Sequence, residues 1–569
     1  MTGDFTLKLE RFLGLRTSVD GSHELKDSES PDMLNFKITS GGKLKRRDGC
    51  EKIFSLPGLR GIYYGKLNGK EIYLAVGGEV LYASHEGFDT LSPVEGEIPG
   101  KETVQFFLFY NALYLLTGDG IRKFDGERLS VPEPYVPTLM IGTSPQGDGV
   151  LYEEANILTP YFKQKFSPDG TSKYFHPVLK RLEGVIWVKV NGRLVESDSY
   201  YWNEANRSLT MLSVPSEGVD TMEVMFEVYR EGGEENRILN CRNAVSFGGA
   251  NDTRAFLYGN RETPGMRYHS GVVDGKPCFE YFPETAYALV GSGEDITSVL
   301  RHYDRLLIWT ENAAYYSYLE YMNGVDGKLV ASFPVLPLSD DRGCSARGQA
   351  VLVENDPCTV GASGLLRWVS TNIRDERNAI LFSDPIARAL QNEDATKAIL
   401  FNRKASSELY VSFDHRIYVY HYGRKLFYYY EAPVAIRRFL EVGNQLFFAS
   451  DEGIYHAVGD LDDGRKIPVR WRSKKMAFGD GNREKNLFRV ALSVKAPSPL
   501  SFLVTLKTDD DKEEEKLFSM EGTGQEIRKS LRYLKRRFHY LELCISSSDA
   551  MPAHVLGLEI KGRQIDRNV

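Results

Sequence analysis

The sequence lacks the features that mark membrane proteins, exported proteins and metal-binding modules. No apolar run approaches the roughly 18 residues that a membrane-spanning helix requires, and residues 1–5 do not have the basic, apolar and small-residue pattern of a signal peptide. The six cysteines are scattered, without a CxxC pair or a metal-ligand spacing. We therefore expect a protein that is made in a cytoplasm and keeps its cysteines as reduced core thiols.

Catalytic motifs are missing as well. The sequence contains no GxSxG, no HExxH and no P-loop, and its ten histidines are dispersed. Residues 460–464 (DLDDG) resemble the start of a calcium loop, but no Glu stands at the closing position, which favours a linker turn. We predict no catalytic residue, no cofactor site and no metal site, and hence a protein that is not an enzyme.

What the chain has instead is a two-strand pattern that recurs from end to end. An alternating apolar stretch is followed by a tight turn of Gly, Asn or Asp and then by a second alternating stretch rich in Tyr and Phe, which is typical of β-hairpins. Copies begin at Ile72, Leu113, Arg305, Leu409 and Leu446, with looser copies at Ala255 and Gly364. Their intervals, of the order of 40 to 50 residues apart from one long gap, are those of propeller blades. We predict an all-β fold with a β-propeller of about seven blades.

The pattern also divides the chain into parts. Residues 1–50 are predicted to form an N-terminal arm with a strand that completes the last blade, and so closes the ring. The blades occupy residues 51–135 and 235–460. Different turns and strands in residues 150–232 predict an inserted β-sandwich, which explains the long gap, and residues 465–569 read as a C-terminal β-sandwich.

The C-terminal sandwich is basic, whereas the rest of the chain is acidic and the whole carries a formal net charge of -7. Either this split marks surfaces with different partners, or it is ordinary solubility charge. Residues 528–537 form the densest basic cluster, and the spacing of Leu531 and Leu534 predicts a short helix there. The candidate interface residues are Arg528, Lys529, Arg532, Lys535, Arg536 and Arg537. They could contact nucleic-acid phosphates, but we favour a solvated face or an acidic protein neighbour.

Several phrases, in their order along the chain, resemble a family of phage virion proteins. These are the packaged-DNA stabilisation and tail-nozzle β-propeller proteins, which complete the head or form part of the tail. The similar phrases are residues 29–36 (ESPDMLNF), 41–49 (GGKLKRRDG), 152–160 (YEEANILTP), 256–260 (FLYGN), 281–285 (YFPET), 303–306 (YDRL), 343–346 (GCSA), 353–355 (VEN) and 373–378 (IRDERN). The resemblance covers roughly residues 10–460, and the basic C-terminal sandwich departs from it.

The resemblance implies a structural protein of a bacteriophage or prophage virion. It would form a homo-oligomeric ring, with sixfold symmetry, that extends the portal and tail channel, contacts portal, adaptor or other tail proteins, and retains or conducts packaged DNA without binding a specific sequence. Two alternatives stay open: a carbohydrate-binding or glycan-acting propeller at the tail tip, and a cytoplasmic propeller scaffold. A glycan-hydrolysing propeller would need paired carboxylates in its central channel.

Overall fold

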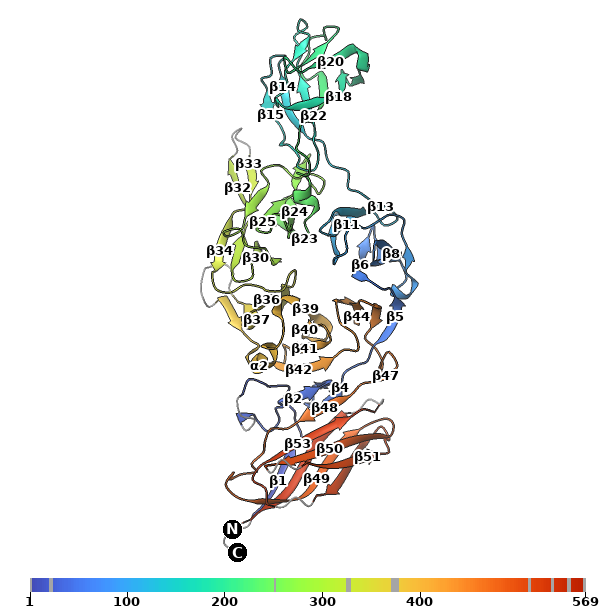
Figure 1. Cartoon of the computed structure of the whole chain (residues 1–569), viewed down its shortest axis with the longest axis vertical. Coiled ribbons are helices and arrows are strands. Elements are labelled where there is room, and N and C mark those ends of the chain that lie inside the picture. The colour runs from blue at the N-terminus through green and yellow to red at the C-terminus, as the bar shows by residue number, and fades with distance from the viewer. Residues whose placement is uncertain are drawn as a thin grey trace.

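The protein is an elongated, almost entirely β-stranded body of three parts in a line. The computed structural model describes residues 3–19, 24–249, 252–323, 329–369, 378–509, 513–533, 537–549 and 554–565. In these residues the α-helices are two single turns, α1 (Asn236–Leu239) and α2 (Ala387–Leu390). A propeller lies in the middle, with one sandwich beyond each side of its rim (Figure 1). The predicted fold class, an all-β propeller with an inserted and a C-terminal β-sandwich, is confirmed.

Seven four-stranded antiparallel sheets surround the propeller axis in the described part of the chain, and we number these blades one to seven. Blade one holds β6 (Leu59–Leu67), β7 (Lys70–Gly77), β8 (Val80–Ser84) and β9 (Ser92–Pro93), and blade two holds β10 (Gln105–Phe109), β11 (Ala112–Leu116), β12 (Ile121–Phe124) and β13 (Leu129–Ser130). Blade three holds β23 (Asn243–Gly249), β24 (Asp252–Tyr258), β25 (Met266–His269) and β28 (Tyr287–Leu289), and blade four holds β29 (Ser298–His302), β30 (Arg305–Trp309), β31 (Ala314–Ser317) and β34 (Val335–Ser339).

The remaining blades follow the same pattern. Blade five holds β35 (Val351–Val353), β36 (Asp356–Gly361), β37 (Gly364–Trp368) and β38 (Ala379–Leu381), and blade six holds β39 (Ile399–Arg403), β40 (Glu408–Phe413), β41 (Arg416–His421) and β42 (Leu426–Glu431). Small hairpins are added by β26 (Gly271–Val273) with β27 (Lys276–Cys278), by β32 (Glu320–Asn323) with β33 (Leu329–Ser332), and by β46 (Leu461–Asp462) with β47 (Arg465–Lys466).

Apolar side chains on both faces of the blades build the propeller core. The second strand of blade six, β40, is buried along its whole length because neighbouring blades cover both of its faces. Between blades one and two, Leu74 and Val76 pack with Leu113 and Leu115. Burying both faces of each sheet stabilises the ring, since each fully buried aliphatic side chain contributes roughly 1.5 to 3 kcal/mol.

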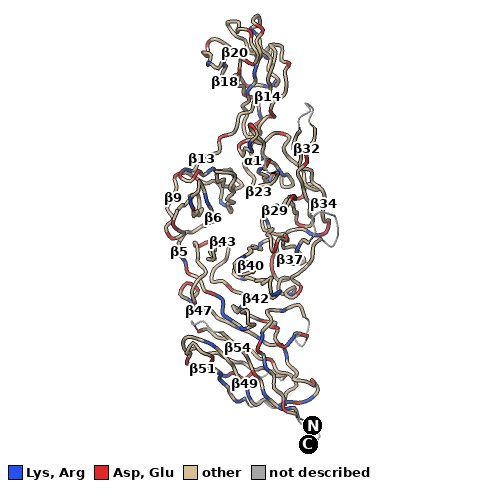
Figure 2. The backbone as a smooth tube through the Cα atoms, turned by 180° about the vertical axis from the view of Figure 1, so that it is seen from behind, with Lys and Arg blue, Asp and Glu red and all other residues tan. Residues whose placement is uncertain are grey.

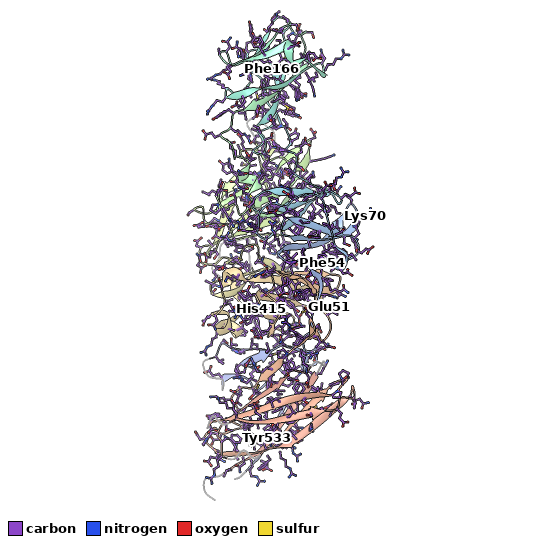
Figure 3. All side chains as sticks on the ribbon, turned by 45° about the vertical axis from the view of Figure 1, so that its right-hand side comes forward. Glu51, Phe54, Lys70, Phe166, His415 and Tyr533 are labelled. Atoms are coloured by element: carbon purple, nitrogen blue, oxygen red, sulfur yellow. The ribbon has the colours of Figure 1, made fainter. Side chains whose placement is uncertain are left out.

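Blade seven closes the ring with a strand from the beginning of the chain. It holds β43 (Arg438–Val442), β44 (Gln445–Ser450), β45 (Gly453–His456) and, as its fourth strand, β5 (Glu51–Ser55). Ile454 is paired with Phe54, and His456 with Glu51; Figure 3 labels these two residues of the closing strand. A closing strand was predicted, but its assignment to residues 1–50 is wrong, because it starts one residue later and the preceding arm does not enter the ring.

The N-terminal arm belongs to the C-terminal sandwich instead. One sheet holds β3 (Phe36–Ile38), β4 (Leu44–Arg46), β54 (His554–Gln564), β49 (Lys485–Lys495) and β52 (Glu526–Arg532), with β1 (Asp4–Leu9) also paired to β54. The facing sheet holds β2 (Asp32–Leu34), β48 (Val469–Arg472), β53 (Leu541–Ser547), β50 (Leu500–Thr508) and β51 (Glu513–Met520). Tyr533, labelled in Figure 3, is fully buried in this sandwich. Four strands of the arm therefore complete a domain whose other strands lie more than 400 residues later.

The inserted sandwich starts earlier than the predicted residue 150. Its larger sheet holds β15 (Val150–Leu151), β14 (Thr138–Thr143), β16 (Tyr161–Phe166), β22 (Met222–Val228), β18 (Leu182–Val190) and β19 (Arg193–Leu194). The smaller sheet holds β17 (Tyr174–Phe175), β21 (Ser208–Met211) and β20 (Tyr200–Asn203). Phe166 lies in the core between them (Figure 3). The proline-rich segment before residue 138 interrupts the strand pattern of the sequence, so the start of β14 could not be recognised there.

Closure of blade seven depends on a glycine that faces the closing strand. Gly453 has a φ of +149°, and a Cβ there would lie 2.2 Å from the carbonyl oxygen of Phe54. We expect Gly453→Ala to lower the free energy of unfolding by about 2 to 4 kcal/mol, because the clash adds to the backbone cost of the substitution. Gly78→Ala is the matched control: its φ is +56° and no atom lies within 4 Å of its Cβ position, so a loss of about 1 kcal/mol is expected. Equal shifts of the two denaturation midpoints would contradict this account of ring closure.

Candidate functional site: the joints and the basic sheet face

The lower joint, between propeller and C-terminal sandwich, is organised by one buried asparagine. Asn35 is 1% exposed and has a φ of +54°. Its side-chain amide donates to the carbonyl oxygen of Pro468 (2.8 Å), while its Oδ1 accepts from the backbone N–H of Glu431 and from Nε of Arg47, both at 2.9 Å. Glu431 ends β42 of blade six, so one side chain connects the arm, the propeller and the segment that enters the C-terminal sandwich.

A buried ion pair lies beside this asparagine. Arg47 donates to both carboxylate oxygens of Asp462, at 2.9 and 2.5 Å, and also to the carbonyl oxygen of Glu431. Both side chains are nearly buried, at 11% and 9% exposure, and breaking such a pair leaves a charge unpaired in a low dielectric. Asp462 is one of the carboxylates that resemble a calcium loop in the sequence. Its place in the β46–β47 hairpin, with both oxygens held by Arg47, is that of a linker turn.

A second asparagine has the same role at the upper joint, between propeller and inserted sandwich. Asn156 is also 1% exposed. Its amide donates to the carbonyl oxygens of Tyr135 and Glu280, both at 2.8 Å, and its Oδ1 accepts from the N–H of Phe282 at 3.0 Å. Arg230 then donates to the carbonyl oxygens of residues 156 and 157. Both asparagines fall in phrases of the sequence that carry the family resemblance, and so do their partners Arg47 and Phe282.

The basic cluster predicted from the sequence is an edge strand and not a helix. Residues 526–532 form β52, in which Ile527 and Leu531 face the core while Arg528 and Arg532 point outward. Lys529 points inward and donates to the carbonyl oxygen of Ser519 at 2.6 Å. The predicted helix is wrong because the arginines alternate with apolar residues at the period of a strand. Arg537 is exposed beyond the strand end, and Lys535 and Arg536 lie outside the described residues.

The outward positions of four strands, β1, β49, β52 and β54, together form what we call the basic sheet face. Its cationic residues are Lys8, Arg489, Lys495, Arg528, Arg532, Lys561 and Arg563, and its carboxylates are Asp4, Glu526 and Glu559. The strands lie side by side in the lower part of the molecule (Figure 2). Sequence reasoning found the two arginines of β52 but missed the others, because they are brought together by pairing between distant strands. The sequence offers one signal for them: within residues 485–495 and 554–564 the cations are separated by even numbers of positions, as residues on one face of a strand are.

The pKa values of two neighbouring groups report the excess of positive charge on this face. Burial, and then the charges of Lys45, Lys495 and Lys37, lower the pKa of His554 below its usual value. Burial opposes ionisation of Glu559, but the hydrogen bond from Lys561 and the charge of Arg528 outweigh burial and lower its pKa. Glu559 lies 2.8 Å from Arg528 and 3.1 Å from Lys561.

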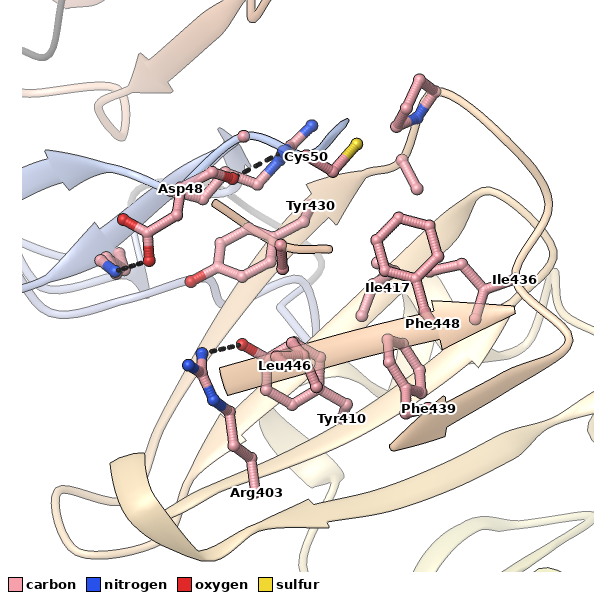
Figure 4. A pocket seen from close by; sticks show the side chains of 16 residues that line it. Asp48, Cys50, Arg403, Tyr410, Ile417, Tyr430, Ile436, Phe439, Leu446 and Phe448 are labelled. Carbon is pink, nitrogen blue, oxygen red and sulfur yellow. Dashed lines mark hydrogen bonds and ion pairs between the residues drawn. The ribbon is translucent and has the colours of Figure 1, made fainter. Parts of the chain in front are cut away.

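Two hollows in the propeller differ in size and lining. The first, between blades six and seven and the arm, is lined by aromatic and aliphatic side chains such as Tyr430 and Phe448 (Figure 4) and has a volume of about 60 Å³. That volume is far below the roughly 300 to 1,000 Å³ of small-molecule sites, so it is a packing gap. The second, of about 620 Å³, lies between blades four and five. It is lined by the carboxylates Glu294, Asp295, Glu311 and Asp340 and by Arg347, which pairs with Asp295.

No group of three or more His, Cys, Asp and Glu side chains in the described ranges could hold a metal ion. In that part of the chain, no helix is long and apolar enough to cross a membrane.

Comparisons with known proteins give no family. No protein-family model matches the sequence, and no curated protein matches it. Among solved structures, BamB from Moraxella catarrhalis is 9% identical over 72% of this chain and 96% of its own, with a TM-score of 0.31. An exo-β-1,3-galactanase from Phanerochaete chrysosporium is 7% identical over 93% of this chain and 99% of its own, with a TM-score of 0.22. A family 29 carbohydrate-binding module is 8% identical over 22% of this chain and 74% of its own, with a TM-score of 0.13.

The matches require one correction. The prediction that the protein is not an enzyme is contradicted by the presence of a galactanase among the similar structures, and we withdraw it. At these identities and TM-scores the likeness assigns neither an activity nor a ligand to this chain.

The joints can be tested by replacing their central asparagines. Asn35→Ala leaves the Pro468 carbonyl, the Glu431 N–H and the Arg47 Nε without their partner, so we expect the free energy of unfolding to fall by about 2 to 4 kcal/mol. Asn68→Ala is the matched control, because Asn68 also has a positive φ, of +52°, but lies in an exposed turn, where its side-chain amide donates to the carbonyl oxygen of Asp125. This substitution should lower the free energy of unfolding by about 1 kcal/mol or less. Calorimetric midpoints measure both variants, and equal losses would show that Asn35 does not hold the joint.

Proposed function

We propose that this protein is a structural component of a bacteriophage or prophage virion, placed in the neck or tail, where it assembles as a ring that extends the portal channel and retains or conducts packaged DNA. The proposal rests on the family resemblance of the sequence. It is supported by one observation above the others: four of the nine phrases that carry the resemblance, residues 29–36, 41–49, 152–160 and 281–285, contribute to the two joints of the three-part body, where Asn35 and Asn156 are the central residues.

The geometry suits an architectural role. Each joint is a set of directed hydrogen bonds and, at the lower joint, a bidentate ion pair, so the sandwiches are held to the rim of the propeller by more than a flexible linker. A rigid body of this length can span neighbouring subunits of an assembly and set their spacing. In this proposal the propeller is the platform, and the two sandwiches reach the neighbouring proteins of the neck or tail.

The proposal is tested in the virus or prophage whose genome encodes the chain. Particles made with the gene disrupted should lose packaged DNA, measured as DNase-sensitive genome, while particles made with the wild-type gene should contain the protein in a fixed ring copy number by quantitative mass spectrometry. Particles that fill and retain their DNA normally without the protein, or that do not contain it, would contradict the proposal.

A further inference from the structure

The basic sheet face carries a row of three like charges, of which Lys561 is paired with Glu559. In the sheet register Arg489 of β49 is directly opposite Arg532 of β52 on one side and Lys561 of β54 on the other. Directly opposed like charges on neighbouring strands, about 5 Å apart, destabilise a sheet. Among the described residues no carboxylate forms an ion pair with Arg489 or Arg532. The row therefore costs the isolated chain stability that an anionic partner would restore.

The same face exposes an aromatic side chain. Phe488 lies in a bulge of β49, is 43% exposed, and has the guanidinium of Arg563 over its ring at 5.8 Å. Exposed aromatic residues next to arginines are the composition of protein interface centres. The ring and the neighbouring arginines together give this face the composition of a docking surface.

An acidic counterpart lies on the propeller of the same chain. The 620 Å³ hollow between blades four and five opens at the propeller end formed by the β30–β31 turn and the loops that join consecutive blades. It is lined by four carboxylates and by one arginine, Arg347, which forms an ion pair with Asp295. Glu294 and Glu311 are exposed, and within the described residues no cation pairs with either. This acidic hollow can accept the lysine or arginine side chains of a basic surface.

The two surfaces do not meet within one chain. The sandwich contacts the propeller through β2 and β3, which lie against β42 of blade six, whereas the acidic hollow lies between blades four and five. A contact between them must therefore join two copies. Because it uses different surfaces on the two partners, it is heterologous and generates a ring when the rotation closes.

We propose that the basic sheet face of one copy docks on the acidic hollow of the next copy, with Arg489, Arg532 and Phe488 as its central contacts. This rests on the proposed ring and identifies the surfaces that build it. Attraction between the two surfaces also orients the copies in one direction around the ring, since a second basic sheet face would be repelled.

A charge-swap experiment on the full-length chain tests the contact. Arg489→Glu with Arg532→Glu makes the sheet face acidic, and Glu294→Lys with Glu311→Lys makes the hollow basic; all four side chains are exposed, so the fold should tolerate the changes. By mass photometry and sedimentation, each double variant alone should associate at least tenfold more weakly than wild type. An equimolar mixture of the two should recover association, because each altered surface then meets its new complement.

Controls and contrary outcomes separate this inference from the proposed function. Lys66→Glu with Lys70→Glu makes the same charge change at exposed positions of blade one and should associate like wild type. If the wild-type chain assembles only on its portal, incorporation into particles is scored for the same variants. Rings that form normally from both double variants would overturn the inference and leave the ring proposal intact.

A further outcome assigns the face to another partner. If the wild-type chain binds single-stranded or duplex DNA, and the Arg489→Glu, Arg532→Glu variant loses that binding while still associating normally, the basic sheet face is a nucleic-acid surface and the inference is wrong. A wild-type chain that is monomeric both in solution and in particles would instead contradict the proposed function.

Discussion

The structure depends on one constraint: the first 55 residues supply the strands that both of the neighbouring domains lack. Strands β1 to β4 complete the sheets of the C-terminal sandwich, and β5 then completes blade seven. Without them a four-stranded blade would have three strands, and β54 and β48 would each lose pairing partners, leaving backbone donors and acceptors unpaired. The two ends of the chain therefore lie in one domain, at its tip away from the propeller (Figure 1), and the arm passes from that domain into blade seven at the lower joint.

The joints follow from this path of the chain. Asn35 stands between β2 and β3, where the arm crosses from one sheet of the sandwich to the other, and its positive φ suits an asparagine better than most other residues. The side chain then satisfies buried backbone groups of two other segments. Buried polar groups that are fully hydrogen-bonded favour one geometry over its alternatives. A defined angle between propeller and sandwich is what an interface between copies requires.

The charge pattern is a second consequence of the same pairing. Arg489 does not stand out in the sequence, and Arg532 does so only as part of a local cluster, but the sheet register places the two directly opposite each other. Local alternation therefore determines that these side chains point outward, while long-range pairing determines that they form a row. Their electrostatic cost in the isolated chain is the physical reason to expect an acidic partner.

The blades could be predicted from the sequence because their signal is local. Alternating apolar residues with a Gly, Asn or Asp turn recur in each hairpin, as at Asp414 between β40 and β41. The role of the arm could not be predicted, because strands of three residues such as Leu44–Arg46 have little pattern and pair across more than 400 residues. At the candidate site, Arg528 and Arg532 were found as a cluster in the sequence, whereas the partners on β49 and β54 require the register.

Deleting residues 1–49 tests the central claim that the arm belongs to the sandwich and that β5 closes the ring. The shortened chain keeps β5 but lacks β1 to β4. In native-state hydrogen exchange, we expect amides of β48, β49, β53 and β54 to exchange at least tenfold faster, while those of blades one to six keep their protection. Unchanged protection of the sandwich, or loss of protection around the whole propeller, would contradict the account.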